Sequence, residues 1–327
     1  MKKHNTNMHN RREFIQKSSL LTAAALSAPL TQVLGHPGRS FASRKFTMQL
    51  DGGSIGVSVG QKELIDLASK YGFESVSAHS AYLADISSSE REKLLADMKQ
   101  KNLVWGNAGL PVQFRNDRST FEADLKALPK HAEGLEKAGV NRITTWIMPN
   151  HPTLNYLQNF REHAIRLREV AKILGDHNIR FGLEYVGPKT LQNAKEYPFM
   201  RSMAETKELI TAIGEPNVGF VLDSFHWYTA GENVNDILTL NNSEVVACDL
   251  NDARSGFSRL EQIDGKRELP MSSGVIDIKG FLNALIQIGF DGPIRAEPFN
   301  QELRDMEDEA AVKKTADAMK EAFELVA

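Results

Sequence analysis

The sequence predicts a single (β/α)8 barrel. From residue 46 onward, apolar runs of about five residues alternate with longer amphipathic segments, a pattern typical of parallel strands joined by helices. Eight such strand–helix pairs span roughly 280 residues, which is the usual size of one barrel domain. No low-complexity tract or linker interrupts this region. The 327-residue chain is therefore expected to hold one barrel domain, at residues 43–327.

The predicted strands are short and apolar, as expected where helices cover both faces of a sheet. They lie at residues 46–50 with 55–58, 73–79, 102–108, 141–147, 179–184, 217–223, 244–250 and 293–297. Apolar residues at helical spacing follow them, for example Leu94 and Met98, and a last helix is expected at 305–325. The segment 251–276 is predicted to be a long loop, which on a barrel commonly forms a wall of the binding site.

A doubly wound α/β sheet is the alternative fold for this alternation of strands and helices. That fold would call for a glycine-rich phosphate loop after the first strand. The glycines of segment 51–56 are arranged as G-G-x-x-G rather than G-x-G-x-x-G, and the sequence has no Walker motif. The barrel is therefore the better prediction.

The charge of the chain argues against nucleic acid as a partner. The whole sequence has a formal net charge of −3, but residues 1–42 contain six lysines and arginines and a single acid. The remaining residues consequently carry a net charge of −8, whereas proteins that bind phosphate backbones are usually basic. The expected partner is a small molecule, and assembly into a homo-oligomer stays open. The single cysteine, Cys248, lies in an apolar run and is expected to be a buried hydrophobe.

Residues 1–42 resemble an export signal of the twin-arginine type. Arg11 and Arg12 precede an alanine-rich apolar stretch at 18–28 that is too short to span a bilayer. The residues at 40–42 have the small–x–small form of a cleavage site. We therefore expect a signal peptide at 1–42, a periplasmic mature protein, and no membrane segment in the mature form. The alternative is an amphipathic N-terminal helix that stays attached.

Four acidic residues end four successive apolar runs: Glu184, Asp223, Asp249 and Glu297. A carboxylate at the end of a buried strand is costly unless a cation pairs with it. Because the strands of a barrel all direct their carboxyl ends to one face, the four carboxylates are expected to converge on a shared metal ion. An all-oxygen site predicts Mn²⁺ or Mg²⁺ ahead of Zn²⁺ or Co²⁺. As alternatives, Asp223 can cap a helix, Asp249 can open a turn and Glu184 can form an ion pair.

Further candidates lie near strand ends. His226 follows Asp223 by three residues, so a helix that begins there would place both side chains on one face. His226 is predicted to contact the substrate, bind the metal or move a proton. His79, after the second strand, and Trp146, at the end of the fourth, are predicted substrate contacts, with Trp146 as an apolar wall for a sugar. Ordinary packing is the alternative for all three, and His163, in a helical stretch, is expected to be solvated.

Four segments of the sequence resemble one known family. They read GLEYVGPKT at 182–190, NVGFVLDSFHW at 217–227, DLNDA at 249–253 and GFDGPIRAEPF at 289–299. These segments are similar to the sugar isomerase/epimerase family with a xylose isomerase-like TIM barrel, and the resemblance covers about residues 46–325. It implies a metal-dependent enzyme whose substrate is a small sugar or glycoside.

The resemblance also implies roles for individual residues. Glu184 and Glu297 would be metal ligands and the catalytic pair that faces the reacting carbons, and Asp223 would be a further ligand. Members of the family usually have a histidine ligand at the position of Asp249, where an aspartate can still bind a hard cation. His226 would contact the substrate or the metal ligands. Arg267 lies in a segment similar to the family's R-x-x-P-G-x-G turn and is a candidate substrate contact.

The implied reaction is the removal and return of a proton beside a carbonyl, by way of an enediolate. One glutamate would take the proton and the other would return it, while the metal ion polarises the carbonyl. Isomerisation or epimerisation of a carbohydrate is the first hypothesis. A lyase that eliminates the group at C1 of a 3-keto-glycoside is the second, because it begins with the same proton removal. A non-catalytic sugar-binding barrel is a third, and the acidic charge argues against a nuclease.

Overall fold

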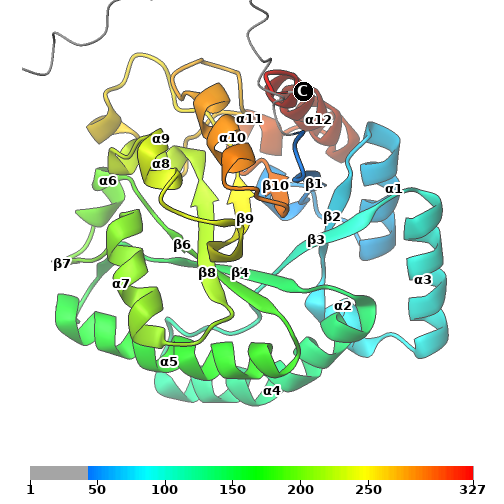
Figure 1. Ribbon diagram of the computed structural model, residues 1–327, viewed down its shortest axis with the longest axis horizontal. Coiled ribbons are helices and arrows are strands. Elements are labelled where there is room, and N and C mark those ends of the chain that lie inside the picture. The colour runs from blue at the N-terminus through cyan, green and yellow to red at the C-terminus, as the bar shows by residue number, and fades with distance from the viewer. Residues whose placement is uncertain (1–42, 327) are drawn as a thin grey trace, which may run out of the picture. The chain divides into compact units, whose positions relative to one another are not determined.

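The computed structural model describes residues 43–326, and the predicted signal peptide at 1–42 lies outside the described residues. Within the described range, eight parallel strands close into a barrel in the order β1-β10-β9-β8-β6-β4-β3-β2 (Figure 1). Neighbouring strands of the barrel are successive barrel strands in the sequence, and helices connect them. The predicted (β/α)8 barrel is therefore confirmed.

The bounds of the elements follow the predicted alternation closely. The barrel strands are β1 (Thr47–Leu50), β2 (Ser75–Ala78), β3 (Val104–Gly109), β4 (Arg142–Ile147), β6 (Arg180–Tyr185), β8 (Val218–Asp223), β9 (Val245–Asp249) and β10 (Pro293–Arg295). The helices are α1 (Gln61–Tyr71), α2 (Ser80–Asp85), α3 (Ser88–Gln100), α4 (Arg118–Ala138), α5 (Tyr156–Asp176), α6 (Lys189–Gln192), α7 (Met203–Ile213), α8 (Ser224–Ala230), α9 (Val234–Ile237), α10 (Ile278–Gln287), α11 (Gln301–Arg304) and α12 (Asp308–Glu324).

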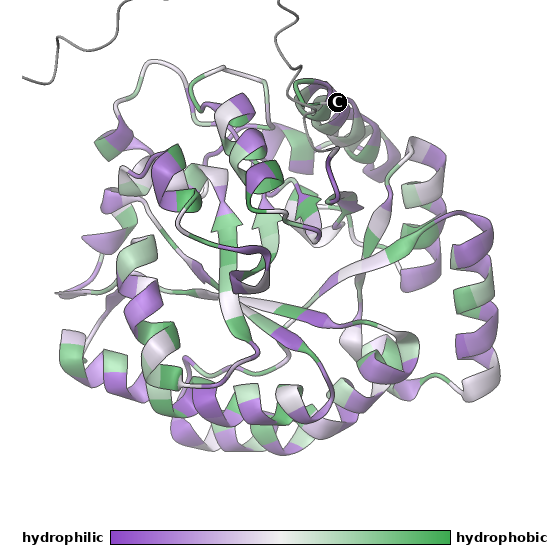
Figure 2. Ribbon diagram, in the orientation of Figure 1, coloured by the Kyte–Doolittle hydropathy of each residue, from purple (hydrophilic) through white to green (hydrophobic). Residues whose placement is uncertain are grey.

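Helices cover the outer face of the barrel, so a strand such as β8 or β9 is buried on both faces and reads as an apolar run. Every residue of β8 and of β9 is buried. The surrounding helices each bury one face, as in α5, where Leu167, Val170 and Leu174 are buried at helical spacing. Figure 2 shows the result as hydrophilic and hydrophobic colours that alternate along these helices. Among residues 43–326, no helix combines the length and the apolar character that crossing a bilayer requires.

Two local features differ from the prediction. The expected strand at 55–58 is wrong, because Gly53–Ile55 forms a 3₁₀ turn and Gly56 adopts a φ of 86°, which favours glycine. The Asp51 side chain holds this turn by accepting a hydrogen bond from the Ser54 N–H at 3.2 Å. A small antiparallel sheet of β5 (Asn150–His151) and β7 (Tyr197–Pro198) was not predicted, since strands of two residues leave no readable pattern.

The register of the strands places the four acids at one end of the barrel. Asp223 on β8 is paired directly with Asp249 on β9, and Glu184 on β6 is paired with Trp146 on β4. Glu297 comes two residues after the end of β10. All four acids therefore lie at the carboxyl ends of strands, the face on which barrels build their binding sites.

Candidate active site

The structure brings the four predicted carboxylates together. One oxygen from each of Glu184, Asp223, Asp249 and Glu297 lies within 4.8 Å of the chosen oxygens of the other three. All four side chains are buried. Because the oxygen ligands of a divalent ion lie about 2.0–2.6 Å from it, oxygens at this spacing could surround one cation.

Asp223 holds the start of the next helix and also faces this acidic cluster. Its Oδ1 accepts hydrogen bonds from the backbone N–H of Phe225 at 2.6 Å and of His226 at 3.4 Å, which caps α8. Asn251 fixes the carboxylate from another side, since its Nδ2 donates to both Asp223 oxygens. The Oδ1 of Asn251 accepts from the N–H of Glu297 at 2.8 Å. The capping role of Asp223 therefore coexists with its place in the cluster.

Two arginines, the buried Arg267 and the half-buried Arg295, neutralise part of the cluster. Arg295, the last residue of β10, donates from Nε and Nη2 to the two oxygens of Asp249 at 2.7 and 3.0 Å. Its Nη2 also reaches Glu297 Oε1 at 2.8 Å. Arg267, from the long loop after β9, donates from Nη1 to Asp223 Oδ2 at 2.7 Å and to Glu297 Oε2 at 3.2 Å. Sequence reasoning missed Arg295, although its spacing of two residues from Glu297 puts both on one face of an extended segment.

Glu184 differs from the other three acids because its carboxylate has no hydrogen-bond partner among residues 43–326. Its Oε1 is buried and bonds to nothing within residues 43–326, although His226 Nε2 lies 3.7 Å away. Four carboxylates thus face two guanidinium groups, which leaves at least two negative charges unmatched when all are ionised. A buried charge without a partner is costly, and a divalent cation supplies the missing positive charge. The donor set therefore fits a divalent metal ion.

Burial makes these carboxylates weaker acids than usual. Desolvation, followed by the negative charges of Glu297 and Asp249, raises the pKa of Glu184 well above its ordinary value. Desolvation also raises the pKa of Glu297 to about 7, although the positive Arg295 opposes the shift. The pKa of Asp249 is raised for the same first reason. A bound divalent ion would favour the charged carboxylates and so reverse these shifts.

His226 lies beside the cluster as a neutral imidazole. Its Nε2 is 3.0 Å from Arg267 Nη2 and must accept this hydrogen bond, because a guanidinium group only donates. The ring proton is therefore assigned to Nδ1, which has no partner among the described residues. Burial, followed by the charge of Arg267, lowers the pKa of His226 well below its ordinary value. This ring therefore accepts from Arg267 and carries no charge at neutral pH.

Arg267 was predicted to contact the substrate, but its donors are already used within the protein. Its Nε donates to the carbonyl of Asp264 at 3.0 Å, and Nη2 donates to the Asp264 carboxylate at 2.8 Å and to His226. Its Nη1 is shared between Asp223 and Glu297. With all five N–H groups engaged, Arg267 holds the cluster and His226 in position.

A cavity of about 610 Å³ opens at this end of the barrel. Five of the predicted residues line it: Glu184, Glu297, His226, Arg267 and Trp146. The Trp146 side chain is 39% exposed, so a large apolar ring is available beside the carboxylates. Small-molecule sites typically combine an apolar wall with a few convergent polar groups in this way.

Three predicted residues do not line the cavity. Asp223 and Asp249 are fully buried and are held by the two arginines. His79 is exposed after the end of β2, where its backbone N–H donates to Gln61 Oε1 at 2.7 Å. The structure does not place the His79 ring in the site, because α2 starts at the next residue and the ring remains outside the cavity.

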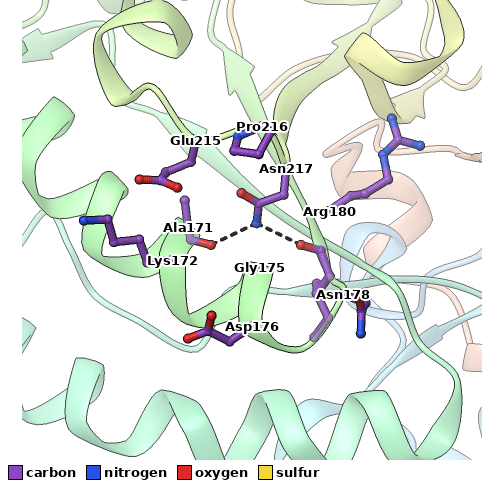
Figure 3. Close-up of a pocket in the computed structure, with 10 residues that line it drawn as sticks. Ala171, Lys172, Gly175, Asp176, Asn178, Arg180, Glu215, Pro216 and Asn217 are labelled. Atoms are coloured by element: carbon purple, nitrogen blue, oxygen red, sulfur yellow. Dashed lines mark hydrogen bonds between the residues drawn. The ribbon is translucent and has the colours of Figure 1, made fainter.

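A second hollow, of about 630 Å³, lies at the opposite end of the barrel (Figure 3). It is lined by the last turns of α5, the start of β6 and residues 215–217 before β8. At its centre Asn217 Nδ2 donates to the carbonyl oxygens of Ala171 at 2.9 Å and of Ile179 at 3.0 Å. This end of a barrel usually serves stability rather than chemistry.

Known proteins resemble this chain in sequence. Residues 65–322 match the family described as the xylose isomerase-like TIM barrel. The inosose isomerase of Bacillus subtilis (strain 168) is 28% identical over 167 residues, which are 49% of this chain and 55% of that protein. The chain thus spans about half the length of the curated relatives that it matches.

Two solved structures resemble this chain over most of its length. A xylose isomerase domain protein from Alicyclobacillus acidocaldarius subsp. acidocaldarius has a TM-score of 0.75 and 29% identity, covering 87% of this chain and 99% of that one. The IolI protein with a binding zinc atom has a TM-score of 0.70 and 18% identity, covering 86% of this chain and 99% of that one. At 18% identity, the second likeness shows the shared fold alone.

Proposed function

Because the chain belongs to the xylose isomerase-like TIM barrel family, we propose that it is a divalent-metal-dependent isomerase or epimerase of a small carbohydrate. The reaction removes a proton from the carbon beside a carbonyl and returns it, by way of an enediolate. The observation that carries the proposal is the buried Glu184 carboxylate, which lines the cavity, has no hydrogen-bond partner in the described part of the chain and lies among three further carboxylates. The likeness of about half the chain to inosose isomerase supports a carbohydrate substrate.

The residues that would hold the metal are Glu184, Asp223, Asp249 and Glu297. Carboxylate oxygens are hard donors and favour Mn²⁺ or Mg²⁺, while the zinc of the similar IolI protein makes Zn²⁺ the alternative. When bound, the ion would supply Lewis-acid stabilisation of the negative charge that develops on the substrate. Asp223 and Asp249 are expected to be weaker ligands than Glu184, because donors within the protein already bond to both oxygens of each.

Glu184 and Glu297 are the proposed proton carriers. Both line the cavity, and two strands, β8 and β9, separate the strand of Glu184 from that of Glu297. The two carboxylates can therefore approach a bound substrate from different sides, as removal and return of a proton on opposite faces requires. His226 accepts a hydrogen bond from Arg267 through Nε2 and so helps to hold this guanidinium group beside the carboxylates.

The test is whether the protein exchanges a substrate proton with solvent in a metal-dependent way. The full chain is stripped with a chelator and reloaded with Mn²⁺, Mg²⁺ or Zn²⁺. Inososes, ketohexoses and 3-keto-glycosides are then incubated with it in D₂O and followed by NMR. Metal-dependent formation of an isomer, with deuterium beside the carbonyl, supports the proposal. Release of an aglycone identifies a lyase instead, and the absence of both exchange and product rules out the proposed reaction.

A further inference from the structure

Three arginines line the cavity, and one of them differs from the other two. Arg267 and Arg295 each pair with at least two carboxylates. Arg115, on the loop between β3 and α4, forms no salt bridge within residues 43–326. A guanidinium group without a counter-charge in the wall of a binding cavity is suited to an anionic part of a ligand.

Neighbouring residues hold the Arg115 guanidinium group in place. Its central carbon, Cζ, lies 4.0 Å from the centre of the Trp146 ring and 4.4 Å from that of Phe114. Its Nη1 donates to the backbone carbonyl of Trp146 at 2.5 Å. The loop itself is fastened by Arg166, whose Nη1 donates to the carbonyl of Phe114 at 2.7 Å. An arginine fixed in this way loses little freedom when a ligand binds.

One edge of the Arg115 guanidinium group stays free. Its Nε and Nη2 make no hydrogen bond with any residue in 43–326, and neither atom is among the fully buried polar atoms without a partner. These two N–H groups share one edge of the planar group, the geometry that binds a carboxylate or phosphate through two parallel hydrogen bonds. All five N–H groups of Arg267, in contrast, already have acceptors.

The pKa values of the three arginines show the same contrast. Burial lowers the pKa of Arg115 to about 10, and no carboxylate opposes this shift. Burial acts in the same direction on Arg267 and Arg295, but the carboxylates around them outweigh it and raise their pKa. Arg115 is therefore the charged group of this cavity whose positive charge is least compensated.

We propose that Arg115 is a specificity-determining residue and that the substrate carries an oxyanion, either a carboxylate or a phosphate, bound at the free Nε–Nη2 edge. This inference rests on the proposed function, because it names the substrate class of the same cavity. Trp146 stacks on Arg115 and is paired in register with Glu184, so the oxyanion would be held on the wall next to the acidic cluster. The carboxylates repel an anion, which leaves the carbonyl end of the substrate to face Glu184 and Glu297.

Matched substrates test the inference. The full chain, loaded with metal, is assayed with carbonyl sugars that differ in one group: a hydroxymethyl, a carboxylate or a phosphate ester. One of the two anionic sugars is expected to have a kcat/KM about 10- to 100-fold above that of the neutral sugar, mostly through KM. The substitution Arg115→Gln should bring this ratio close to one. Arg118→Gln is the matched control, because Arg118 is a nearby exposed arginine outside the cavity, and it should leave the ratio unchanged.

The preferred anion identifies the source of the oxyanion, carboxylate or phosphate. A ratio near one in the unsubstituted protein overturns the inference. So does a preference for the anionic sugar that survives Arg115→Gln.

A binding experiment separates this inference from the proposed reaction. An aldonate, its uncharged alditol and inorganic phosphate are titrated into the metal-loaded full chain by calorimetry. Binding of the aldonate or of phosphate that Arg115→Gln weakens about 10- to 100-fold supports the oxyanion site even when no carbonyl sugar is turned over. In that case only the proposed reaction fails. Equal affinity for aldonate and alditol, with no binding of phosphate, overturns the site even when isomerisation is observed.

A conservative substitution distinguishes anion binding from a structural role of Arg115. Arg115→Lys keeps the positive charge but cannot form the bidentate contact of the Nε–Nη2 edge. It should therefore retain part of the anion preference that Arg115→Gln removes. The melting temperature of each variant reports whether the fold is intact. Where Arg115→Gln does not fold, Arg115→Lys is compared with the unsubstituted protein and is expected to weaken anion binding by about tenfold. An unchanged affinity in Arg115→Lys would then overturn the two-pronged contact.

Discussion

The barrel has a hollow at each end, and the two have nearly equal volumes of about 610 and 630 Å³. At the amino-terminal end, Asn217 Nδ2 donates to two backbone carbonyls (Figure 3), and Arg180 Nη2 donates to further backbone carbonyls. At the carboxyl end, Glu184 Oε1 and His226 Nδ1 are buried without partners among the described residues. Hydrogen-bonded polar groups stabilise a fold, whereas a buried polar group without a partner costs stability until a ligand or a water completes it. The two hollows therefore have similar volumes but differ in whether their buried polar groups have hydrogen-bond partners.

The largest effect is expected from Glu184→Gln. Glutamine has nearly the same shape but cannot accept a proton as a carboxylate does, so kcat should fall about 10²- to 10⁴-fold. The fold should persist, because the substitution removes a buried negative charge that its neighbours repel. Glu215→Gln changes a glutamate of the amino-terminal hollow and should leave kcat unchanged. Both kcat values are measured with the substrate from the NMR screen. Equal values for the two variants would contradict a catalytic role of Glu184.

Arginines at the two ends provide the next comparison. Arg295→Met leaves Asp249 buried without its partner and should lower the free energy of unfolding by about 3–5 kcal/mol. A divalent ion should restore part of this loss, because it replaces the missing positive charge. Arg180→Met removes only hydrogen bonds to backbone carbonyls and should cost about 1–2 kcal/mol.

Urea titrations of both arginine variants, with and without Mn²⁺, measure these changes. For the Arg180 variant the loss should be the same with and without the ion. If both variants lose the same free energy of unfolding, with and without Mn²⁺, then Arg295 does not stabilise the acidic cluster by its charge.

Metal binding itself should stabilise the carboxyl end. An ion present at 100 times its dissociation constant stabilises the folded protein by about 2.7 kcal/mol, which raises the melting temperature. Asp223→Asn should remove most of this rise, since Asp223 belongs to the cluster. Asp176→Asn, an exposed aspartate beside the other hollow, should preserve it. The absence of any rise with Mn²⁺, Mg²⁺ or Zn²⁺ after chelator treatment would contradict the metal site.

The barrel and its acidic cluster could be predicted because both leave local patterns in the sequence. A buried parallel strand reads as a short apolar run, and an acid at the end of such a run stands out. Glu184 and Glu297 lie more than a hundred positions apart in the sequence. They come together because all barrel strands direct their carboxyl ends to the same face. The sequence therefore predicted which carboxylates converge, without information on their hydrogen-bond partners.

The remaining parts of the site depend on loops, whose paths have no comparable periodicity. Arg115 was missed because nothing in its loop marks it, and the role of Arg267 as a clamp depends on the course of the long loop after β9. The expectation that His163 is solvated is wrong. Its ring is buried against Phe114 at 5.5 Å and Phe199 at 5.2 Å, both from connecting segments that fold over α5. These contacts join distant parts of the chain, so helical spacing could not reveal them.

A small effect, similar to that of Arg180→Met, is expected from Asn217→Ala in the amino-terminal hollow. The substitution removes the side-chain donor of the Ala171 and Ile179 carbonyls. Through these two hydrogen bonds, Asn217 links the end of α5 to the residue that precedes β6. Water can enter this hollow and replace the lost hydrogen bonds in part, so the expected cost is about 1–2 kcal/mol in the free energy of unfolding. Urea titration measures this cost, and kcat at 25 °C should stay the same.

A fall in kcat without a loss of stability in Asn217→Ala would give the amino-terminal hollow a part in function. Buried polar groups without hydrogen-bond partners would then not be enough to identify the functional end of the barrel. An unchanged kcat together with the expected loss of stability would instead assign Asn217 a structural role, because both N–H groups of its side-chain amide bond to backbone carbonyls.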